Sequence, residues 1–267
     1  MARAGVEAQL QLTLALVNGQ RGTVFLLLGA LAWIVAGLAG AMVTVAVLGV
    51  GSALLRRSLG PALIPEASQL VIVLVAASAF QGTLLLGALR QGRLTGGGDR
   101  RAGLGFRPIR RGGRVVLLCA VMIALLLAFV LLAARLPALR EFAKSVTPDV
   151  LSGLGEGGPA VSVLKVAMVV ILAPASEELF FRGWLWEALR QRGQAIFTTA
   201  CLTATPWLLL HGIDSPGRIL ILIPAAVVFS LARHQGGGVL ASLAVHVTNN
   251  TIAVLMQAIA VLVGQQS

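Results

Sequence analysis

Residues 115–134 read VVLLCAVMIALLLAFVLLAA, a run of twenty residues without one charged side chain. A helix of about 20 apolar residues crosses the hydrocarbon core of a bilayer. A further apolar run begins near residue 160, and others cover about 23–55, 67–89, 196–211, 218–233 and 239–263. The sequence therefore predicts an all-α protein, a polytopic transmembrane helical bundle of about seven spans, within a range of six to eight.

The composition supports a membrane protein. Of the 267 residues, 57% are apolar and 12% are charged, and the mean hydropathy is +0.91, whereas a soluble domain is about 45–50% apolar and about 25% charged. These values exclude a water-soluble enzyme, a disordered chain and a disulfide-rich secreted module. Cys119 and Cys201 lie inside apolar runs, so they indicate neither a disulfide framework nor a CxxC metal site.

The basic residues predict the orientation of the chain. The net charge is +11, and residues 90–114 contain eight arginines but only one acid, Asp99. Strict alternation of the spans puts this basic loop on the same side as the N-terminus and Arg233. The positive-inside rule then favours a multi-pass protein of the cell membrane with a cytoplasmic N-terminus. The expected partners of the arginines are membrane lipids. No nucleic acid is expected, because no stretch mixes aromatic and basic residues as a nucleic-acid-binding surface would.

The chain divides into three parts by its polarity. Residues 1–22 are too polar to span and are expected to form an N-terminal polar, interfacial segment. Residues 23–134 are expected to hold the N-terminal transmembrane helices with the basic loop 90–114. Residues 160–263 contain the polar side chains that suggest a function.

The stretch ASEELFFRG at 175–183 places charges inside an apolar region. An ionisable residue at the centre of a membrane helix costs about 2.5 kcal/mol or more and needs a partner. Glu178 and Arg182 are four apart, in the order that favours an ion pair. Glu177 lies about 100° around a helix from Glu178 and stays available as a general base. The alternative is an interfacial helix end solvated by lipid head groups.

His211 is predicted to lie at the depth of Glu177. The turn before its helix is expected at Gly193 and Gln194, and Glu177 lies 17 residues before Gln194 while His211 lies 17 after it. In an antiparallel hairpin, equal distance from the turn means equal depth. The alternative is a core histidine with satisfied hydrogen bonds and no catalytic role.

His246 and Asn250 are four apart and share one face of the last span, with Asn249 close to that face. Imidazole and carboxamide groups can donate hydrogen bonds to the oxyanion that forms during attack on an amide carbonyl. The alternative is interhelical hydrogen bonding without catalysis. A straight helix places His246 about 10 Å shallower than His211.

Three aromatic residues, Phe181, Trp184 and Trp186, precede Arg190 and Arg192. Aromatic side chains beside arginines are typical of the membrane interface, so these three are expected to form an interfacial belt.

The motifs EELFFR (177–182), WLLLH (207–211) and HVTNN (246–250) resemble those of the CPBP family, which includes CAAX prenyl proteases of the Ras-converting type and bacteriocin-processing or immunity (Abi) proteases. The family pattern is EExxxR, FxxxH and HxxxN or HxxxD on successive transmembrane helices. Trp207 departs from it, because phenylalanine is usual there. The resemblance covers about residues 160–262.

This resemblance implies an intramembrane endopeptidase acting on a peptide or a membrane-associated protein. Glu177 and His211 would activate water, His246 and Asn250 would stabilise the oxyanion, and Glu178 and Arg182 would support the site. Family members are commonly labelled metalloproteases. Although HExxH is absent, zinc remains open as a cofactor, with Glu177, His211 and His246 as ligands; we favour water activated without a metal.

A different class of protein would use the same polar cluster without hydrolysis. The alternatives are an immunity-type binding protein and a proton-coupled transporter. The sequence shows no inverted repeat, which disfavours a transporter.

Overall fold

The structure is a computed structural model that describes residues 2–59, 68–147 and 158–264, with side chains for 22–58, 70–147 and 158–260. All regular elements in these ranges are helices. Six helical segments of the described chain are long and apolar enough to cross a membrane: Gly22–Ser58, Leu70–Thr95, Gly112–Arg135, Gly158–Gln191, Gly217–Gly236 and Val239–Ala260. With the shorter apolar helix Ile196–His211, they confirm the predicted polytopic bundle.

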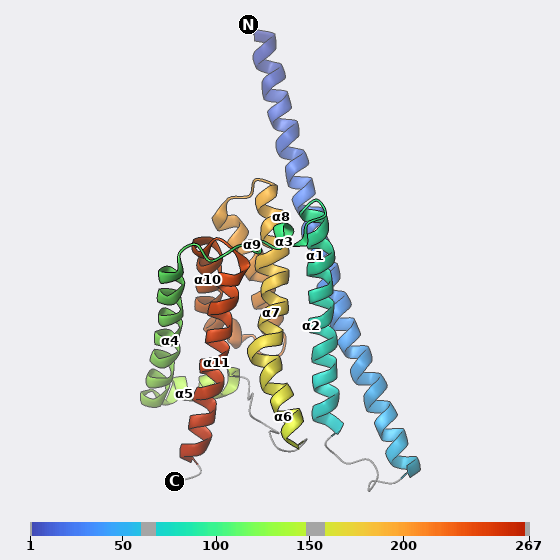
Figure 1. Cartoon of the computed structure of the whole chain (residues 1–267), viewed down its shortest axis with the longest axis vertical. Coiled ribbons are helices and arrows are strands. Elements are labelled where there is room, and N and C mark those ends of the chain that lie inside the picture. Colours follow the sequence, from blue (N-terminus) through green and yellow to red (C-terminus); the bar gives the residue numbers. More distant parts are fainter. Residues whose placement is uncertain (1, 60–67, 148–157, 265–267) are drawn as a thin grey trace.

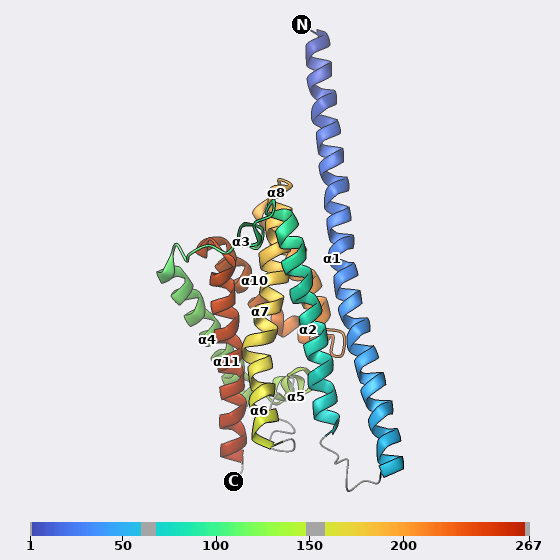
Figure 2. The same ribbon diagram turned by 45° about the vertical axis from the view of Figure 1, so that its right-hand side comes forward.

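The first two helices pack side by side (Figures 1 and 2). Helix α1 spans Ala2–Leu59 and α2 spans Ser68–Thr95. A Cβ at Gly37 would lie 2.9 Å from the Phe80 ring, so this glycine allows the close contact. Helix α1 begins at Ala2, so residues 2–22 of the expected interfacial segment form the first part of this helix. The side chains of residues up to 21 lie outside the described set.

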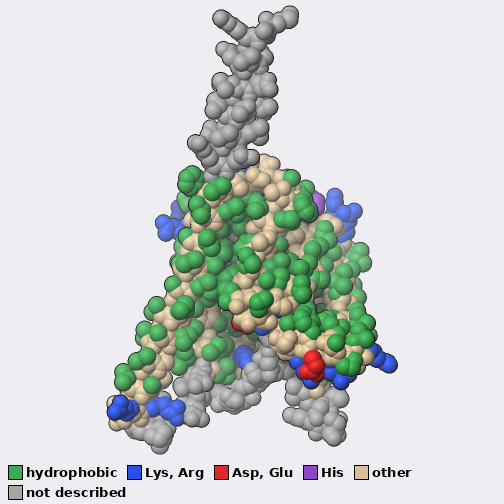
Figure 3. All heavy atoms as spheres, turned by 180° about the vertical axis from the view of Figure 1, so that it is seen from behind, with side chains coloured by type: hydrophobic (Ala, Val, Ile, Leu, Met, Phe, Trp, Pro, Cys, Tyr) green, Lys and Arg blue, Asp and Glu red, His purple; other side chains and the backbone are tan. Residues whose placement is uncertain are grey.

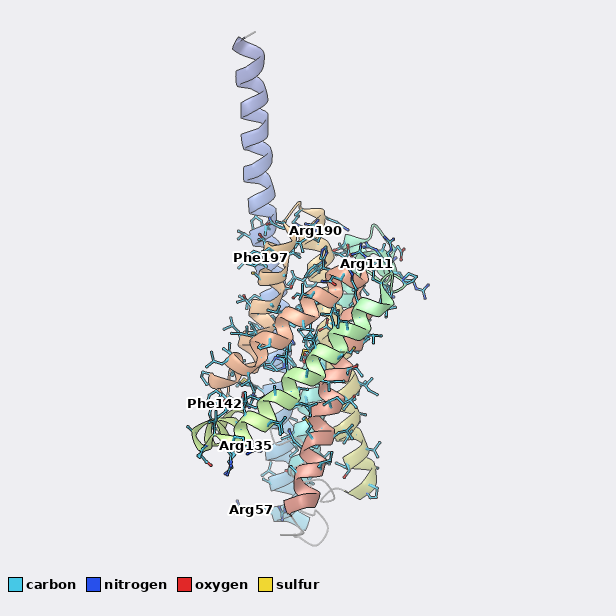
Figure 4. All side chains as sticks on the ribbon, turned by 90° about the vertical axis from the view of Figure 1, so that its left-hand side faces the viewer. Arg57, Arg111, Arg135, Phe142, Arg190 and Phe197 are labelled. Carbon is cyan, nitrogen blue, oxygen red and sulfur yellow. The ribbon has the colours of Figure 1, made fainter. Side chains whose placement is uncertain are left out.

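The basic loop lies at the same end of the bundle as the N-terminus, with the C-terminus at the other end (Figure 1). The loop holds the short helix α3 (Arg100–Gly103) and leads into α4 (Gly112–Arg135). Figure 4 shows Arg111 and Arg190 at this end and Arg57 and Arg135 at the other. An apolar band lies between the two sets of basic side chains (Figure 3), as expected for a membrane-spanning bundle.

The end opposite the basic loop carries a short amphipathic helix, α5 (Pro137–Val146). Arg218 Nε donates to the Val146 carbonyl at 2.8 Å and ties this helix to α10. A Cβ at Gly217 would lie 2.8 Å from Val146, so α10 (Gly217–Gly236) begins directly against α5.

One long helical run carries the first motif and contains two wider, π-helical segments. Its parts are α6 (Gly158–Ala167), η1 (Met168–Leu172), α7 (Ala173–Glu177), η2 (Glu178–Leu185) and α8 (Trp186–Gln191). Pro174 follows η1 almost directly. Because proline lacks an N–H and crowds the preceding turn, a wider turn before it relieves the conflict.

The expected interfacial belt is wrong. Phe181, Trp184 and Trp186 are all buried in the bundle. Phe181 and Trp184 lie in η2, which packs against α2, α9 (Ile196–His211) and α11 (Val239–Gly264). Trp186 begins α8, which packs against α9, so these aromatic residues lie among helices instead of lipid head groups. An aromatic residue near an arginine does not distinguish these two environments.

The hairpin after this run has the predicted turn, with Gly193 in a left-handed conformation (φ 76°). Helix α9 spans Ile196–His211. Its 16 residues rise about 24 Å, so this helix is shorter than a hydrocarbon core of about 30 Å, and His211 is its last residue.

Helix α11 (Val239–Gly264) follows α10 across a tight turn at Gly237 (φ 81°). The connection between the runs predicted at 218–233 and 239–263 is therefore shorter than expected, because α10 continues through Gly236.

Candidate active site

Glu177, the last residue of α7, is buried at 7% exposure and points into the protein instead of lipid. Trp207 Nε1 donates to its Oε2 at 2.7 Å, and Gln81 Nε2 donates to its Oε1 at 3.3 Å. Trp207 comes from α9 and Gln81 from α2. Both donors are neutral, so they hold the carboxylate without cancelling its charge.

Glu178 has different partners. Its Oε1 lies 3.1 Å from Arg182 Nη1 and 3.0 Å from His246 Nδ1, and the side chains of Glu178 and Arg182 are fully buried. The predicted ion pair is confirmed, and the predicted separation of the two neighbouring carboxylates is found as well. The alternative of a helix end solvated by head groups is wrong, because Glu177, Glu178 and Arg182 are all buried.

Arg182 also contacts aromatic rings. Its guanidinium carbon lies 4.9 Å from the Trp207 ring centroid and 5.7 Å from that of Phe229. Arg182 Nε and Nη2, like Glu178 Oε2, have no hydrogen-bond partner among the described residues. Cation–π contact therefore supplies part of the stabilisation that this buried cation needs.

Both imidazoles lie beside the Trp207 indole. The ring centroid of His211 is 4.4 Å from that of Trp207, and the His246 centroid is 5.8 Å from it. His246 also stacks on Phe229 at 4.4 Å. Glu177, His211 and His246 thus meet around one side chain, although no hydrogen bond joins Glu177 to either imidazole in the described part of the chain.

The ring nitrogens of both histidines can be assigned from their acceptors. His211 Nδ1 lies 2.9 Å from the Trp207 carbonyl oxygen, and His246 Nδ1 faces the Glu178 carboxylate. A carbonyl or an ionised carboxylate only accepts, so each Nδ1 carries the proton and each Nε2 remains for another partner.

Asn250 is half-buried and shares the predicted face with His246, since both contact the α6–α8 run. Its Nδ2 donates to the Val169 carbonyl at 2.9 Å, and Asn249 Nδ2 donates to Asn250 Oδ1 at 2.9 Å. The bond to Val169 is the interhelical contact that the non-catalytic alternative expected. A carboxamide has two N–H groups, so one stays available.

A catalytic zinc ion would need three protein ligands, and the sequence offers Glu177, His211 and His246 for them. Among the residues that the structure describes, no group of three or more His, Cys, Asp and Glu side chains could hold a metal ion. These three side chains therefore do not form a zinc site here, and the proposed mechanism uses no metal.

A second buried ion pair lies beside η2. Arg233 Nη2 contacts Glu187 Oε1 at 2.5 Å, and Arg233 Nε donates to the Arg182 carbonyl at 2.5 Å. Arg233, which was expected on the side of the basic loop, is 3% exposed, because α10 continues past it. Arg107 of the basic loop joins the same carboxylate, with its Nη2 3.2 Å from Glu187 Oε1. His234, next to Arg233, is exposed on α10.

Sequence reasoning missed Gln81 and the role of the Trp207 N–H. Gln81 interrupts the apolar run of α2 and could have been noticed as a polar residue in a span. Trp207 was noted only as a replacement of the family's phenylalanine, although a buried indole N–H usually finds an acceptor.

Residues 159–252 match the family model described as Type II CAAX prenyl endopeptidase Rce1-like. The predicted resemblance is confirmed over this segment. None of the curated proteins and none of the solved structures matches the chain. The Rce1-like segment contains all three motifs, from Glu177 to Asn250, but not Gln81. The matched family is described as one of prenyl endopeptidases, enzymes that cleave a peptide or protein substrate.

Proposed function

We propose that the chain is an intramembrane endopeptidase in which Glu177 activates water for attack on a peptide bond. The observation that carries the proposal is the different pairing of two adjacent buried carboxylates. Arg182 and His246 bind Glu178, whereas Glu177 is held only by neutral donors. A carboxylate without a cationic partner keeps its ability to take a proton, which a general base requires.

The proposed reaction follows from the free atoms around Trp207. Glu177 takes a proton from water, with His211 Nε2 orienting that water. The hydroxide attacks the carbonyl carbon, and the negative charge moves to the carbonyl oxygen. Collapse of the tetrahedral intermediate breaks the C–N bond, and the proton on Glu177 passes to the leaving amine.

His246 and Asn250 are proposed to stabilise the oxyanion. His246 Nδ1–H donates to Glu178, so donation from Nε2 to the oxyanion needs a proton on both ring nitrogens. Asn250 Nδ2 retains one N–H. Arg182 balances the remaining charge of Glu178. Two donors converging on a developing oxyanion are what acyl transfer requires.

The proposed substrate class follows from the matching family. It is a membrane-associated peptide with a C-terminal CAAX sequence, prenylated on its cysteine. We also propose that the protein lies in the cell membrane with its N-terminus and basic loop in the cytoplasm, because this end carries the arginines of residues 90–114.

The test uses purified full-length protein in liposomes. Synthetic peptides that end in CAAX, with and without a prenyl group, are incubated with the wild type, Glu177→Gln and Glu141→Gln, and the products are identified by mass spectrometry. Glu141 is an exposed control on α5 that pairs with Lys144.

Wild type and E141Q are expected to release the same peptide fragments, and E177Q none. Cleavage by E177Q at the wild-type rate would overturn the role of Glu177. Binding of the peptides without cleavage by the wild type would overturn the protease and support a non-hydrolytic binding protein.

A further inference from the structure

We infer that Trp207 and Gln81 are positioning residues for the water-activating pair: together they fix both oxygens of Glu177, and Trp207 also fixes the tautomer of His211. The inference rests on the proposed function. It goes beyond the family match, because Gln81 lies outside residues 159–252 and Trp207 replaces the phenylalanine of the family pattern.

Trp207 connects the two groups through different atoms. Its indole Nε1 donates to Glu177 Oε2 at 2.7 Å, and its backbone oxygen lies 2.9 Å from His211 Nδ1. A proton held on Nδ1 leaves Nε2 of a neutral imidazole as an acceptor, the form that can orient a water molecule. The same residue therefore controls the carboxylate and the imidazole.

The Trp207 ring is itself held in place. It is 2% exposed, lies edge-on to Phe229 at a centroid distance of 5.7 Å, and has the Arg182 guanidinium 4.9 Å away. A ring fixed by these contacts presents its N–H in one direction only. Phenylalanine can make the packing contacts but has no N–H to offer.

Gln81 fixes the second oxygen from another helix. The Gln81 amide nitrogen donates to Glu177 Oε1 at 3.3 Å, while the Ser176 hydroxyl donates to Gln81 Oε1. An ionised carboxylate cannot donate, so the amide nitrogen must face Glu177 and the amide oxygen must face Ser176. Helix α2 thus helps to aim a catalytic group that belongs to the C-terminal part of the chain.

The two donors leave room for the water. A carboxylate has about four acceptor positions, and Trp207 and Gln81 occupy one on each oxygen. The carboxylate is fixed in orientation, remains unneutralised and keeps a lone pair on each oxygen. This is the arrangement that a preorganised base needs.

The experiment compares full-length variants in liposomes on the peptide that the wild type cleaves. Trp207→Phe deletes the N–H and keeps an aromatic ring, and Gln81→Leu deletes the amide. Trp184→Phe is the matched control, because Trp184 is equally buried and packs on Phe180 without contacting Glu177. Thermal unfolding of each variant is measured alongside kcat and KM, and Glu177→Gln sets the inactive limit.

W207F is expected to lower kcat about tenfold or more, with KM within about twofold, because a hydrogen bond to a charged group is lost. Q81L should lower kcat less, since its bond is longer. W184F should keep both constants. As a readout that needs no activity, the resonance Raman band of the Trp207 indole N–H should move toward the free N–H position in Glu177→Leu.

The outcomes separate this inference from the proposed function. Wild-type kcat in W207F, together with an inactive E177Q, would overturn the positioning role and leave Glu177 as the base. Equal losses in W207F and W184F would assign Trp207 to packing alone. An active E177Q would overturn both proposals. Should W207F fail to fold, a wild-type kcat in Q81L overturns the two-donor arrangement, and a lowered kcat at unchanged KM supports it.

Discussion

The ion pair between Glu178 and Arg182 predicts a large loss of stability when its cation alone is removed. Both side chains are fully buried, and Arg182 Nη1 is 3.1 Å from Glu178 Oε1. Arg182→Met preserves much of the side-chain volume but removes the cation and leaves Glu178 its hydrogen bond from His246 Nδ1. Breaking a buried pair in this way costs about 3–5 kcal/mol, because an uncompensated charge stays inside the protein.

The double variant Glu178→Gln/Arg182→Met removes both charges. It should be more stable than R182M alone, since no unpaired ion remains. Lys144→Met is the control: Lys144 and Glu141 also form an ion pair, at 2.9 Å, but their side chains are 66% and 70% exposed. Such exposed pairs contribute about 0–1 kcal/mol.

Reversible unfolding in mixed micelles, followed by tryptophan fluorescence, measures the free energy of unfolding of all four proteins. We expect R182M to lose several times more stability than K144M, and the double variant to recover part of the loss. An R182M variant within about 1 kcal/mol of the wild type would refute the reasoning, since buried pairs lose more than this when one partner is removed.

Three further predictions concern the basic loop, the cofactor and the topology. Gly105→Ala should lower the midpoint of thermal unfolding, because Gly105 has φ +62° and a Cβ there would lie 2.4 Å from Arg233 Nη2. Gly113→Ala is the control and should leave the midpoint unchanged, because the space around Gly113 is open. Equal midpoints for the two variants would contradict the packing of Gly105 against Arg233. Chelators should leave peptide cleavage unchanged, and a loss restored by zinc would refute the metal-free proposal. For the topology, each cysteine variant is made in a protein that lacks the native Cys119 and Cys201 and is expressed in intact cells. An impermeant maleimide should label Arg57→Cys but not Arg111→Cys, and the reverse pattern would invert the proposed orientation.

The spans and the ion pair could be predicted because they depend on local sequence. Apolar length alone located the spanning helices, and the spacing of Glu178 and Arg182 predicted their contact. Glu177 and His211 lie at equal sequence distances from the turn at Gly193, which predicted equal depth. In the structure both contact the Trp207 indole. Each of these inferences used only helix geometry.

The rest depends on which helices cover which faces. Gln81 contacts Glu177 across 96 positions of the chain, and nothing in either segment specifies that contact. Phe181, Trp184 and Trp186 were expected at the membrane interface, because aromatic side chains near Arg190 and Arg192 suit both an interface and a core. Their burial depends on the packing of η2 against α2, α9 and α11 and of α8 against α9.

The central claim is that Glu177 removes a proton from water and does not attack the peptide itself. A single turnover in water enriched in oxygen-18 tests it most directly, with mass spectra of both the released fragment and the protein segment that contains Glu177. We predict that every new carboxyl terminus carries one labelled oxygen and that Glu177 carries none. An unlabelled product together with label on Glu177 would show attack by the carboxylate and would contradict the account.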